Sequence, residues 1–353
     1  MSNKDKNLRT QMRKRQKKKK RKLLLYILIP LLLIVGAVGS YGFYLVKKAE
    51  NVASKSFEDD GRENGSEKRE KDVDPEQDNV SILFIGIDDS EKRSSNGSSP
   101  QLSDALILAT LNKEDHSVKM LSIPRDSYVY IPEQGYKTKI NHAHSLGGPK
   151  STIETVENFL DVPVDYYVRV NFNAFIDVVN TLDGITVDVP YEFYEQDSQD
   201  RKGAIHLTAG EQTLNGEEAL ALARTRKMDN DIERGKRQQQ IMKAIVKRAL
   251  SLDSVLKYDD IMEAVGNNMK TNMEFSEMRS LMSYGMQGDL DMESYTLEGH
   301  DSYINNTYYY QLNEDSVASV QDTLKEHLNI DEDTSINASD NNHGDMELAN
   351  PAN

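Results

Sequence analysis

Short apolar runs separated by polar turns open the part of the chain that has the composition of a folded domain. The first three such runs are Val80–Ile87, Ala105–Leu111 and Val118–Ile123. Apolar runs of this length, bounded by Gly, Pro, Asn or Asp, are typical of buried strands. The polar connection Asn112–Ser117 is short enough for a hairpin, so we predict that the three runs form an antiparallel meander.

Helical and strand patterns alternate after these runs, which predicts an α/β domain with a mixed central sheet. Asn215 and Glu218 match a capped helix start, with the helix running to about Ala223. We predict a loop over Tyr136–Pro149 and a polar, mobile segment over Tyr191–Ala204. The other predicted helices are Ser151–Leu160, Phe172–Leu182, Glu233–Leu250, Val255–Val265, Phe275–Met286 and Asp315–Leu328, and the other strands are Val164–Val170, Ile185–Val189 and Glu293–Leu297.

The helix predicted over Glu233–Leu250 carries polar side chains on the face that should point to the core. Its apolar stripe is formed at helical spacing by Ile241, Ala244, Ile245 and Ala249, and towards the N-terminus it continues through Arg234, Arg237 and Gln238. An arginine is costly to bury unless an anion meets it. The stripe therefore indicates that an anion lies against the first turns of this helix.

Two more arginines, Arg224 and Arg226, lie just before that helix. If the chain is extended there, both side chains point to one face, because side chains alternate along a strand. Four guanidiniums converging near a helix N-terminus suit a phosphate or pyrophosphate. The alternative is a solvated basic face whose arginines pair locally with Asp229 and Asp231. The position on an apolar stripe favours the anion site.

Charged residues also cluster where the predicted meander turns. The end of its first strand, the start of its second and the end of its third lie at one edge of the sheet, which brings Asp88, Asp104 and Arg125 together. Paired carboxylates suit Mg²⁺, which takes one or two carboxylates and completes its shell with phosphate and water. The alternative is that each aspartate only caps a turn.

The predicted loop Tyr136–Pro149 adds further candidate ligands. His142 and His144 have the spacing of a metal-binding pair, but the lack of Cys and the small number of other His argue against zinc. We interpret both histidines as structural or substrate-contacting. Lys139 is a better candidate for a phosphate contact than Lys137.

Charge is spread very unevenly over the 353 residues. Residues 1–22 carry a net charge of +11 in a chain whose total is −15, and residues 23–46 contain no charged side chain. About 20 apolar residues cross a bilayer. We therefore predict a transmembrane helix over 23–46, with the basic arm 1–22 in the cytoplasm and the rest of the chain outside the cell.

Two other interpretations of this N-terminal region are less favoured. A cleaved signal peptide would have a shorter apolar run, followed by an A-x-A-like cleavage site. A sequence-specific nucleic-acid partner would require a recognisable binding module, and we expect none. Beside a membrane span, a basic arm is better explained by contact with anionic membrane lipids.

Composition divides the rest of the chain. Residues 47–78 and 331–353 are rich in charged and small polar residues, which predicts a disordered extracellular stalk and a disordered acidic tail. Residues 79–330 are predicted to form one extracellular domain, with the motifs above in 79–251 and a mostly helical C-terminal part in 252–330. Because the chain has no cysteine, its core rather than disulfides must stabilise this domain.

The chain resembles the LytR–CpsA–Psr family of cell-envelope proteins. The resemblance is close over about residues 79–251 and looser beyond them, and the basic arm, single span and stalk fit the same architecture. The fragments that carry it, in the family's order, are ILFIGIDD, SDALILATLN, SIPRDSYVYIP, KINHAHSLGG, VDYYVRVNFNAFIDVVNTLDGI, LTAGEQTLNGEEALALARTRK and ERGKRQQQIM.

This resemblance implies a three-layer α/β/α domain preceded by one N-terminal transmembrane helix. It also implies a Mg²⁺-dependent transferase, with Mn²⁺ as the alternative metal. Family members move an anionic glycopolymer, of the wall teichoic acid or capsular polysaccharide type, from a polyprenyl-pyrophosphate carrier to peptidoglycan. Their apolar channel for the lipid tail is expected here between the helices at Ser151–Leu160, Phe172–Leu182 and Glu233–Leu250.

The resemblance also assigns roles to individual residues. Asp88 and Asp104 match the metal-binding positions, and the path of the insertion Ser90–Gln101 over the site stays open. The catalytic positions are matched by Asp104, Arg125, Arg224 and Arg226. The pyrophosphate-binding positions are matched by Arg125, Lys139, Arg224, Arg226, Arg234, Arg237 and Gln238.

In the implied mechanism, a muramic-acid hydroxyl attacks the polymer-side phosphorus and polyprenyl phosphate leaves. Asp104 or Asp126 is the first candidate for the base, because no His stands in an obvious position. Nucleophilic Ser or Cys chemistry has no support, since the chain has neither G-x-S-x-G nor Cys. Two other classes remain open: a lipid pyrophosphate hydrolase, and a membrane-tethered sensor that binds polyprenyl pyrophosphate without turnover.

Overall fold

The computed structural model describes residues 44–88, 101–251 and 269–330, apart from 45, 49 and 64. The chain forms two compact units, residues 1–51 and 52–353. The described residues of the first unit are helical. Within these described ranges, no helix is long and apolar enough to cross a bilayer. The predicted arm 1–22, nearly all of the predicted span 23–46, most of the insertion Ser90–Gln101, the helix Val255–Val265 and the tail 331–353 lie outside them.

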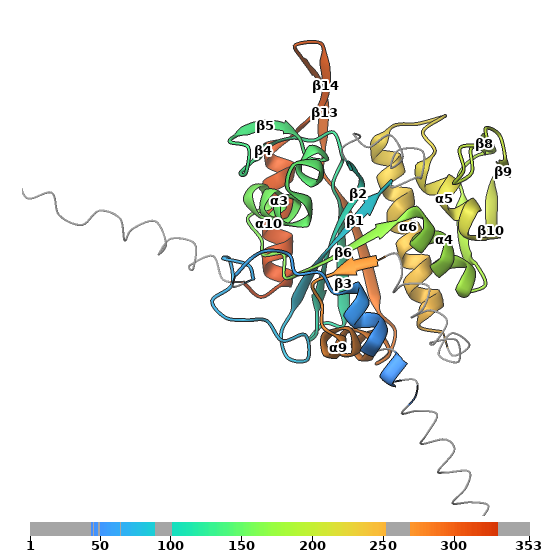
Figure 1. Cartoon of the computed structure of the whole chain (residues 1–353). Helices are drawn as coiled ribbons and strands as arrows, with labels where there is room; N and C mark the ends of the chain where they lie inside the picture. Colours follow the sequence, from blue (N-terminus) through green and yellow to red (C-terminus); the bar gives the residue numbers. More distant parts are fainter. Residues whose placement is uncertain are drawn as a thin grey trace, which may run out of the picture. The chain divides into compact units, whose positions relative to one another are not determined.

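A six-stranded mixed sheet forms the centre of the second unit (Figure 1). The sheet order is β11 (Met269–Thr271), β6 (Tyr166–Asn171), β1 (Val80–Ile87), β2 (Ser103–Asn112), β3 (Ser117–Ser122) and β12 (Asp291–Thr296). β2 pairs antiparallel with both β1 and β3, so the predicted meander is confirmed. β6 runs parallel to β1, and β12 runs parallel to β3. The near-continuous apolar sequence of β1 fits a central strand that is covered on both faces.

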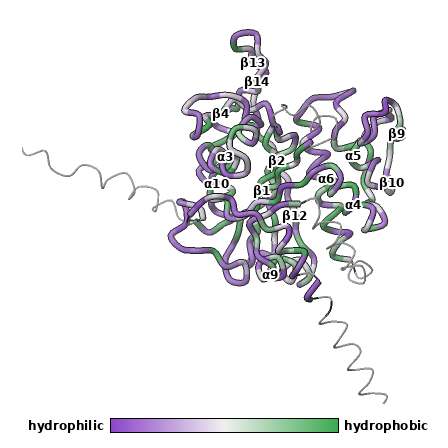
Figure 2. The backbone as a smooth tube through the Cα atoms, viewed as in Figure 1, coloured by the Kyte–Doolittle hydropathy of each residue, from purple (hydrophilic) through white to green (hydrophobic). Residues whose placement is uncertain are grey.

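One face of the sheet packs against α3 (His142–Leu160) and α10 (Glu314–His327). Side chains alternate between the two faces along each strand, and those of Leu83 and Leu108 point to this face. There they pack against Ile153 and Leu160 of α3 and Leu324 of α10. Hydrophobic positions accordingly follow the central strands in Figure 2. The helix predicted over Ser151–Leu160 starts earlier than expected, at His142, and is kinked at Gly147 and Gly148.

The opposite face of the sheet packs against α6 (Asp231–Ala249) and α9 (Phe275–Gly285), and α4 (Phe172–Thr181) and α5 (Gly216–Arg224) lie on the same side of the sheet and pack on each other (Figure 1). The predicted α/β domain with a mixed central sheet is therefore confirmed, with helices on both sides of the sheet. Ile107 and Met120 of the sheet meet Met242 of α6 and Tyr284 of α9. Figure 1 shows α4 to α6 on the side of the sheet opposite to α3 and α10.

Within the described residues, four two-stranded antiparallel sheets lie outside the central sheet, and two of them correct the sequence analysis. They are β4 (Tyr128–Ile131) with β5 (Tyr136–Lys139), β7 (Ile185–Val189) with β10 (Gly210–Leu214), β8 (Phe193–Glu195) with β9 (Ile205–Leu207), and β13 (Gly299–Ile304) with β14 (Thr307–Leu312). The predicted loop Tyr136–Pro149 is therefore strand and helix. The predicted mobile segment Tyr191–Ala204 is anchored by buried Phe193, whose strand is too short for periodicity to reveal.

The segment before β1 packs on the domain, which contradicts the prediction of a disordered stalk for its described residues from 52 to 78. Arg62 pairs with Asp60 and with Glu157 of α3, and Arg69 pairs with Asp165 at 2.7 Å. Composition alone suggested solvated charges here. The charges instead find carboxylates that are distant in sequence.

Candidate functional site

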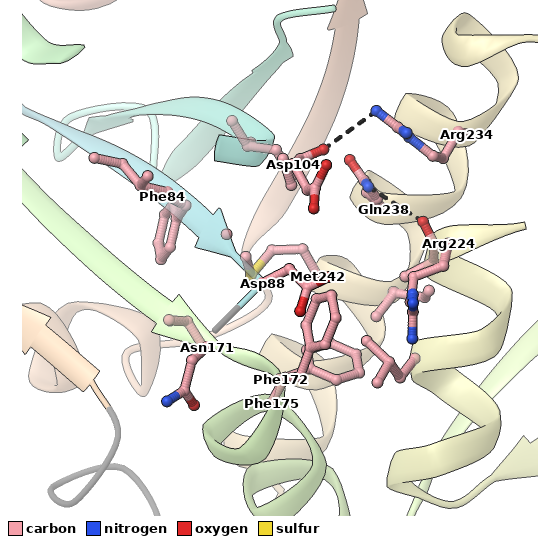
Figure 3. A pocket seen from close by; sticks show the side chains of 18 of the residues that line it. Phe84, Asp88, Asp104, Asn171, Phe172, Phe175, Arg224, Arg234, Gln238 and Met242 are labelled. Carbon is pink, nitrogen blue, oxygen red and sulfur yellow. Dashed lines mark hydrogen bonds between the residues drawn. The ribbon is translucent and has the colours of Figure 1, made fainter. Parts of the chain in front are cut away.

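A cavity of about 1110 Å³ lies between the second face of the sheet and helices α4, α5 and α6. Its walls are largely apolar, as Figure 3 shows for Phe84, Phe172, Phe175 and Met242. Further apolar lining comes from Ile107, Val168, Val170, Val178, Leu220, Ile241, Ile245 and Met269. A pocket of this size and character suits a hydrocarbon chain.

The expected walls of this cavity need one correction. α4 and α6 line it as predicted, and α5 adds Leu220 and Ala223. The helix over Ser151–Leu160 does not line it, because its apolar residues, such as Ile153, pack on the other face of the sheet. Periodicity identified the helix as amphipathic but could not say which face of the sheet it covers.

Charged and polar side chains gather at one end of the cavity. Asp88 follows β1, Asp104 lies at the start of β2 and Arg125 follows β3, so the meander brings all three into the lining of one cavity, as predicted. Helices α5 and α6 and the connection between them add Arg224, Arg226, Lys227, Arg234 and Gln238 to the lining. The cavity is therefore amphipathic, with an apolar body and a cluster of arginines and carboxylates at one end.

Arg125 joins the carboxylates of this cluster. Its Nη1 donates to Asp104 Oδ1 over 2.6 Å, and its Nε lies 3.6 Å from Asp126 Oδ2. Burial alone would lower the pKa of Arg125, but the charges of Asp104, Asp126 and Asp231 outweigh it and raise that pKa. Among the residues described, Nε has no hydrogen-bond partner. This N–H of a permanently charged guanidinium thus has no hydrogen-bond acceptor among those residues, although Asp126 and Asp231 both lie within 4.0 Å of its nitrogen.

Arg234 lies deeper, with only 7% of its side chain exposed. Its Nη2 lies 2.9 Å from Asp231 Oδ1 and donates to the Asp104 carbonyl over 3.2 Å, a contact drawn in Figure 3. Burial lowers its pKa to about 10; Asp231 opposes this shift, whereas Arg125 and Arg226 add to it. The group is still charged at neutral pH, and its Nε finds no hydrogen bond within the described part of the chain.

Arg224 is placed by the helix that it ends. An Asn215–Glu218 capping box starts α5, as predicted, and Thr225 after the helix is extended (φ −61°, ψ 140°). The Arg224 guanidinium lies over the Phe172 ring, 4.7 Å from its centroid. Arg226, half-exposed, lies at the same end, with Nη1 3.6 Å from Asp231 Oδ1.

Asp231 contacts three arginines of the site, and sequence reasoning did not single it out, although it does not itself line the cavity. Its Oδ1 lies 2.9 Å from Arg234, 3.6 Å from Arg226 and 4.0 Å from Arg125. Being the first residue of α6, it had been interpreted only as a local partner of the arginines. The available signal was its spacing of three from Arg234, which puts both side chains on one helix face.

Two predicted ligands of pyrophosphate lie elsewhere. Arg237 is buried between α5 and α6, where it pairs with Asp229 and donates to the carbonyls of Leu222 and Thr225. It does not line the cavity, so it ties the end of α5 to α6 instead. Lys139 pairs with Asp126 at 2.7 Å and also lies outside the lining.

Gln238 and Gly235 fix the position of α6. Gln238 lines the cavity and donates to the Ala223 carbonyl over 3.2 Å. Gly235 meets the end of β3 so closely that a Cβ there would lie 2.4 Å from Ser122 Oγ. Gln239 donates to the carbonyls of Met120 and Tyr295, each over 2.8 Å. These contacts hold Arg234 beside the sheet edge.

The carboxylates at this end fit a divalent cation that shares its shell with a substrate. Asp88 and Asp104 line one end of one cavity. Within the described ranges, no group of three or more His, Cys, Asp or Glu forms a complete metal cage. Mg²⁺ commonly binds through one or two carboxylates plus phosphate oxygens and water. The two aspartates therefore suit Mg²⁺ together with a bound phosphate.

Comparison with known proteins gives consistent matches over most of the chain. The LytR_cpsA_psr family model matches residues 43–326. The polyisoprenyl-teichoic acid–peptidoglycan teichoic acid transferase TagT of Bacillus subtilis is 41% identical over 301 residues, which is 85% of this chain and 92% of TagT.

Two solved structures are similar in fold as well. One is TagT bound to LIIa-WTA, with a TM-score of 0.67 and 40% identity. The other is the LytR-CPS2A-psr family protein YwtF (TagT) with bound octaprenyl pyrophosphate lipid, with a TM-score of 0.62 and 37% identity. Each match covers 76% of this chain and 98% of the other.

Proposed function

The chain belongs to the LytR-CpsA-Psr family, and from this premise we propose that it transfers a teichoic-acid-type glycopolymer from a polyprenyl-pyrophosphate carrier to peptidoglycan. The observation that carries the proposal is the amphipathic cavity: an apolar body that ends at arginines and carboxylates. A polyprenyl pyrophosphate has the same division, with a long hydrocarbon tail and a multiply charged head. The similar structure with octaprenyl pyrophosphate bound supports this assignment.

The arginines bind and orient the pyrophosphate. Arg125 and Arg234 each offer a buried N–H without a protein acceptor among the described residues, and so does Nη1 of Arg224. Arg226 adds positive charge from the exposed side. Phosphoryl transfer needs little covalent help from a protein and depends on positioning and on stabilising negative charge. These guanidiniums supply both.

Asp88 and Asp104 are the residues that would hold Mg²⁺, with Mn²⁺ as the alternative. When bound, the metal would neutralise charge on the pyrophosphate oxygens. Arg125 holds the Asp104 carboxylate in place through the 2.6 Å contact. A hydroxyl of the peptidoglycan glycan attacks the polymer-side phosphorus, its proton passes to a nearby carboxylate, and polyprenyl phosphate leaves.

The proposed setting is the outer face of the cell membrane. The uncharged run 23–46 anchors the chain, the basic arm 1–22 stays in the cytoplasm, and residues 52–330 act outside. This topology places the cavity on the side where a lipid-linked polymer meets peptidoglycan. A capsular-polysaccharide-type polymer is the alternative donor cargo.

The test uses the full-length chain in detergent with a polyprenyl-pyrophosphate-linked teichoic acid oligomer and un-cross-linked peptidoglycan oligomers. Mass spectrometry follows the products in Mg²⁺ and in EDTA. We expect a glycan–phosphate–peptidoglycan adduct only with Mg²⁺, and its loss in Arg125→Ala and Asp104→Ala. Arg201→Ala, which removes an exposed arginine paired with Asp197, is the matched control and should keep activity.

Two outcomes would contradict the proposal. Polyprenyl phosphate released without an adduct would identify a lipid pyrophosphate hydrolase. Tight donor binding without any product, across several polymers and both metals, would identify a sensor that binds the lipid without turnover.

A further inference from the structure

Four tyrosines gather at the edge of the sheet that carries Arg125. β12 runs parallel to β3, so the chain leaves β12 at that same edge and then forms the projecting hairpin β13–β14 (Figure 1). Three of the tyrosines are on this hairpin and the fourth is on β4. These residues, Tyr128, Tyr303, Tyr308 and Tyr309, are called the tyrosine surface below.

The rings of the tyrosine surface pack in two pairs, one on each face of the hairpin β13–β14, because Tyr308 and Tyr309 are neighbours on one strand. The ring centroids of Tyr128 and Tyr309 lie 4.8 Å apart, and those of Tyr303 and Tyr308 lie 5.7 Å apart. Tyr303 is 72% exposed, and the other three are partly exposed. An exposed aromatic group of this kind adds little to folding and is typical of a recognition surface.

This surface is continuous with the arginine cluster. The Tyr310 N–H donates to the Asp126 carbonyl over 2.8 Å, next to Arg125 in the chain. Lys139, paired with Asp126, has its Nζ 5.5 Å from the Tyr308 ring centroid and 5.9 Å from that of Tyr309. Burial raises the pKa of Tyr308, as do its hydrogen bond to Asp301 and the charges of Asp301, Asp126 and Asp231, so its hydroxyl lies in the field of the site's carboxylates.

The charges of the tyrosine surface do not suit the anionic polymer. Its contacting lysine is already ion-paired with Asp126, and Asp301 adds a negative charge that accepts from the Tyr308 hydroxyl over 2.9 Å. Aromatic faces match the C–H faces of pyranose rings, and the phenol and carboxylate groups match sugar hydroxyls. The chemistry favours a sugar chain without phosphate.

We propose that the tyrosine surface binds the glycan strand of the acceptor and so presents its hydroxyl to the arginine cluster. This inference rests on the proposed function, and it adds where on the protein the acceptor glycan binds. The donor occupies the cavity with its lipid tail, and the acceptor approaches along β13–β14 from outside it.

The test measures acceptor and donor kinetics separately for the full-length chain, with the assay described above. Tyr303→Ala should raise the KM for glycan strands at least fivefold and leave the KM for the lipid-linked donor unchanged. Tyr303→Trp should restore the acceptor KM, because it restores an aromatic face. The matched control is Tyr194→Ala, whose exposed ring stacks on His206 at 4.2 Å in the hairpin β8–β9; it should leave both KM values unchanged.

Direct binding separates this inference from the proposed function. Glycan strands are titrated against the chain without donor, so the readout does not require turnover. Weaker binding by Tyr303→Ala than by wild type supports the inference, even if the wild type forms no adduct and the transferase proposal fails. Equal glycan binding by the two proteins overturns the inference alone and leaves the proposed function untouched. An equal rise in both KM values also overturns it, because the hairpin would then act on the whole site.

Discussion

Arg125 Nη1 donates to Asp104 Oδ1 over 2.6 Å, joining the end of β3 to the start of β2 across one edge of the sheet. The two side chains are 21 residues apart in sequence. Their contact links a residue proposed to bind pyrophosphate to a residue proposed to bind Mg²⁺. Neither side chain can therefore be removed without changing the other.

This pairing predicts non-additive kinetics. Arg125→Ala and Asp104→Ala should each lower kcat by roughly 10²–10³, the typical effect of removing one group that stabilises transition-state charge. The fold-decrease in kcat of the double variant should be much smaller than the product of the two single fold-decreases, because each single change already disrupts the pair. A double-mutant cycle on the transfer rate measures this, and full additivity would show that the two residues act independently.

Arg234 and Arg237 are expected to respond in different ways. Arg237 satisfies two carbonyls at the end of α5 and pairs with Asp229, so Arg237→Ala should lower the free energy of unfolding by about 3 kcal/mol. Arg234 is buried beside two like charges, and Asp231 keeps Arg226 and Arg125 as partners without it, so Arg234→Met should cost less stability than Arg237→Ala while raising the donor KM more than tenfold.

Denaturant unfolding and donor titration separate these two effects. Arg237→Lys serves as the control for charge, and it should fail to restore stability because a lysine lacks the planar fork. If Arg237→Ala were fully stable and failed only in donor binding, the assignment of Arg237 to the α5–α6 contact would be wrong.

The close approach of α6 to β3 predicts a compensating pair of substitutions. Gly235→Ala should destabilise the fold and lower transfer activity, because the new Cβ would meet Ser122 Oγ at 2.4 Å. Adding Ser122→Ala removes that oxygen and leaves a contact of 3.3 Å, so the double variant should recover most of the loss. Thermal unfolding and transfer rates measure both effects; no recovery would place the strain elsewhere.

His327 predicts a loss of stability in acid. Its ring contacts Thr110 and Ser117, and burial lowers its pKa to about 4, with the charge of Lys119 adding to the shift and Asp115 and Glu293 opposing it. The unfolded chain takes up a proton on this side chain near pH 6.5, whereas the folded chain stays neutral until about pH 4. Stability should therefore fall by up to about 3 kcal/mol as the pH drops from 6.5 to 4.

Unfolding by denaturant at several pH values tests this dependence. His327→Gln should flatten the curve over that window, although it lowers stability at neutral pH. His300→Gln, on the exposed hairpin β13–β14, should leave the curve unchanged. A wild-type curve that stays flat from pH 6.5 to 4 would contradict the prediction.

Local pattern was enough to predict the sheet edge. Three short apolar runs and the six-residue connection between the second and third specify the meander. The meander alone brings Asp88, Asp104 and Arg125 to one edge of the sheet. The capping box of α5 could also be predicted from the sequence, because Asn215 and Glu218 interact within one helical turn. Both features depend on neighbours that are close in sequence.

Long-range contacts could not be predicted in the same way. Arg234 and Arg237 share a helix face in the sequence pattern, and only the position of the α5 carbonyls decides that one faces the cavity and the other faces α5. The predicted stalk failed for the same reason, since Arg69 meets Asp165, 96 residues away. Composition and periodicity carry no information about such partners.

Asp231 has a consequence for turnover. A cluster of arginines that includes its own carboxylate holds an incoming anion less tightly than the same cluster without one, because the ligand has to compete for the same guanidiniums. A pyrophosphate, with its greater charge, competes better than the lipid monophosphate that remains after transfer. If the arginines bind the carrier as proposed, the aspartate would favour release of the spent carrier, so that one molecule of the enzyme could act again.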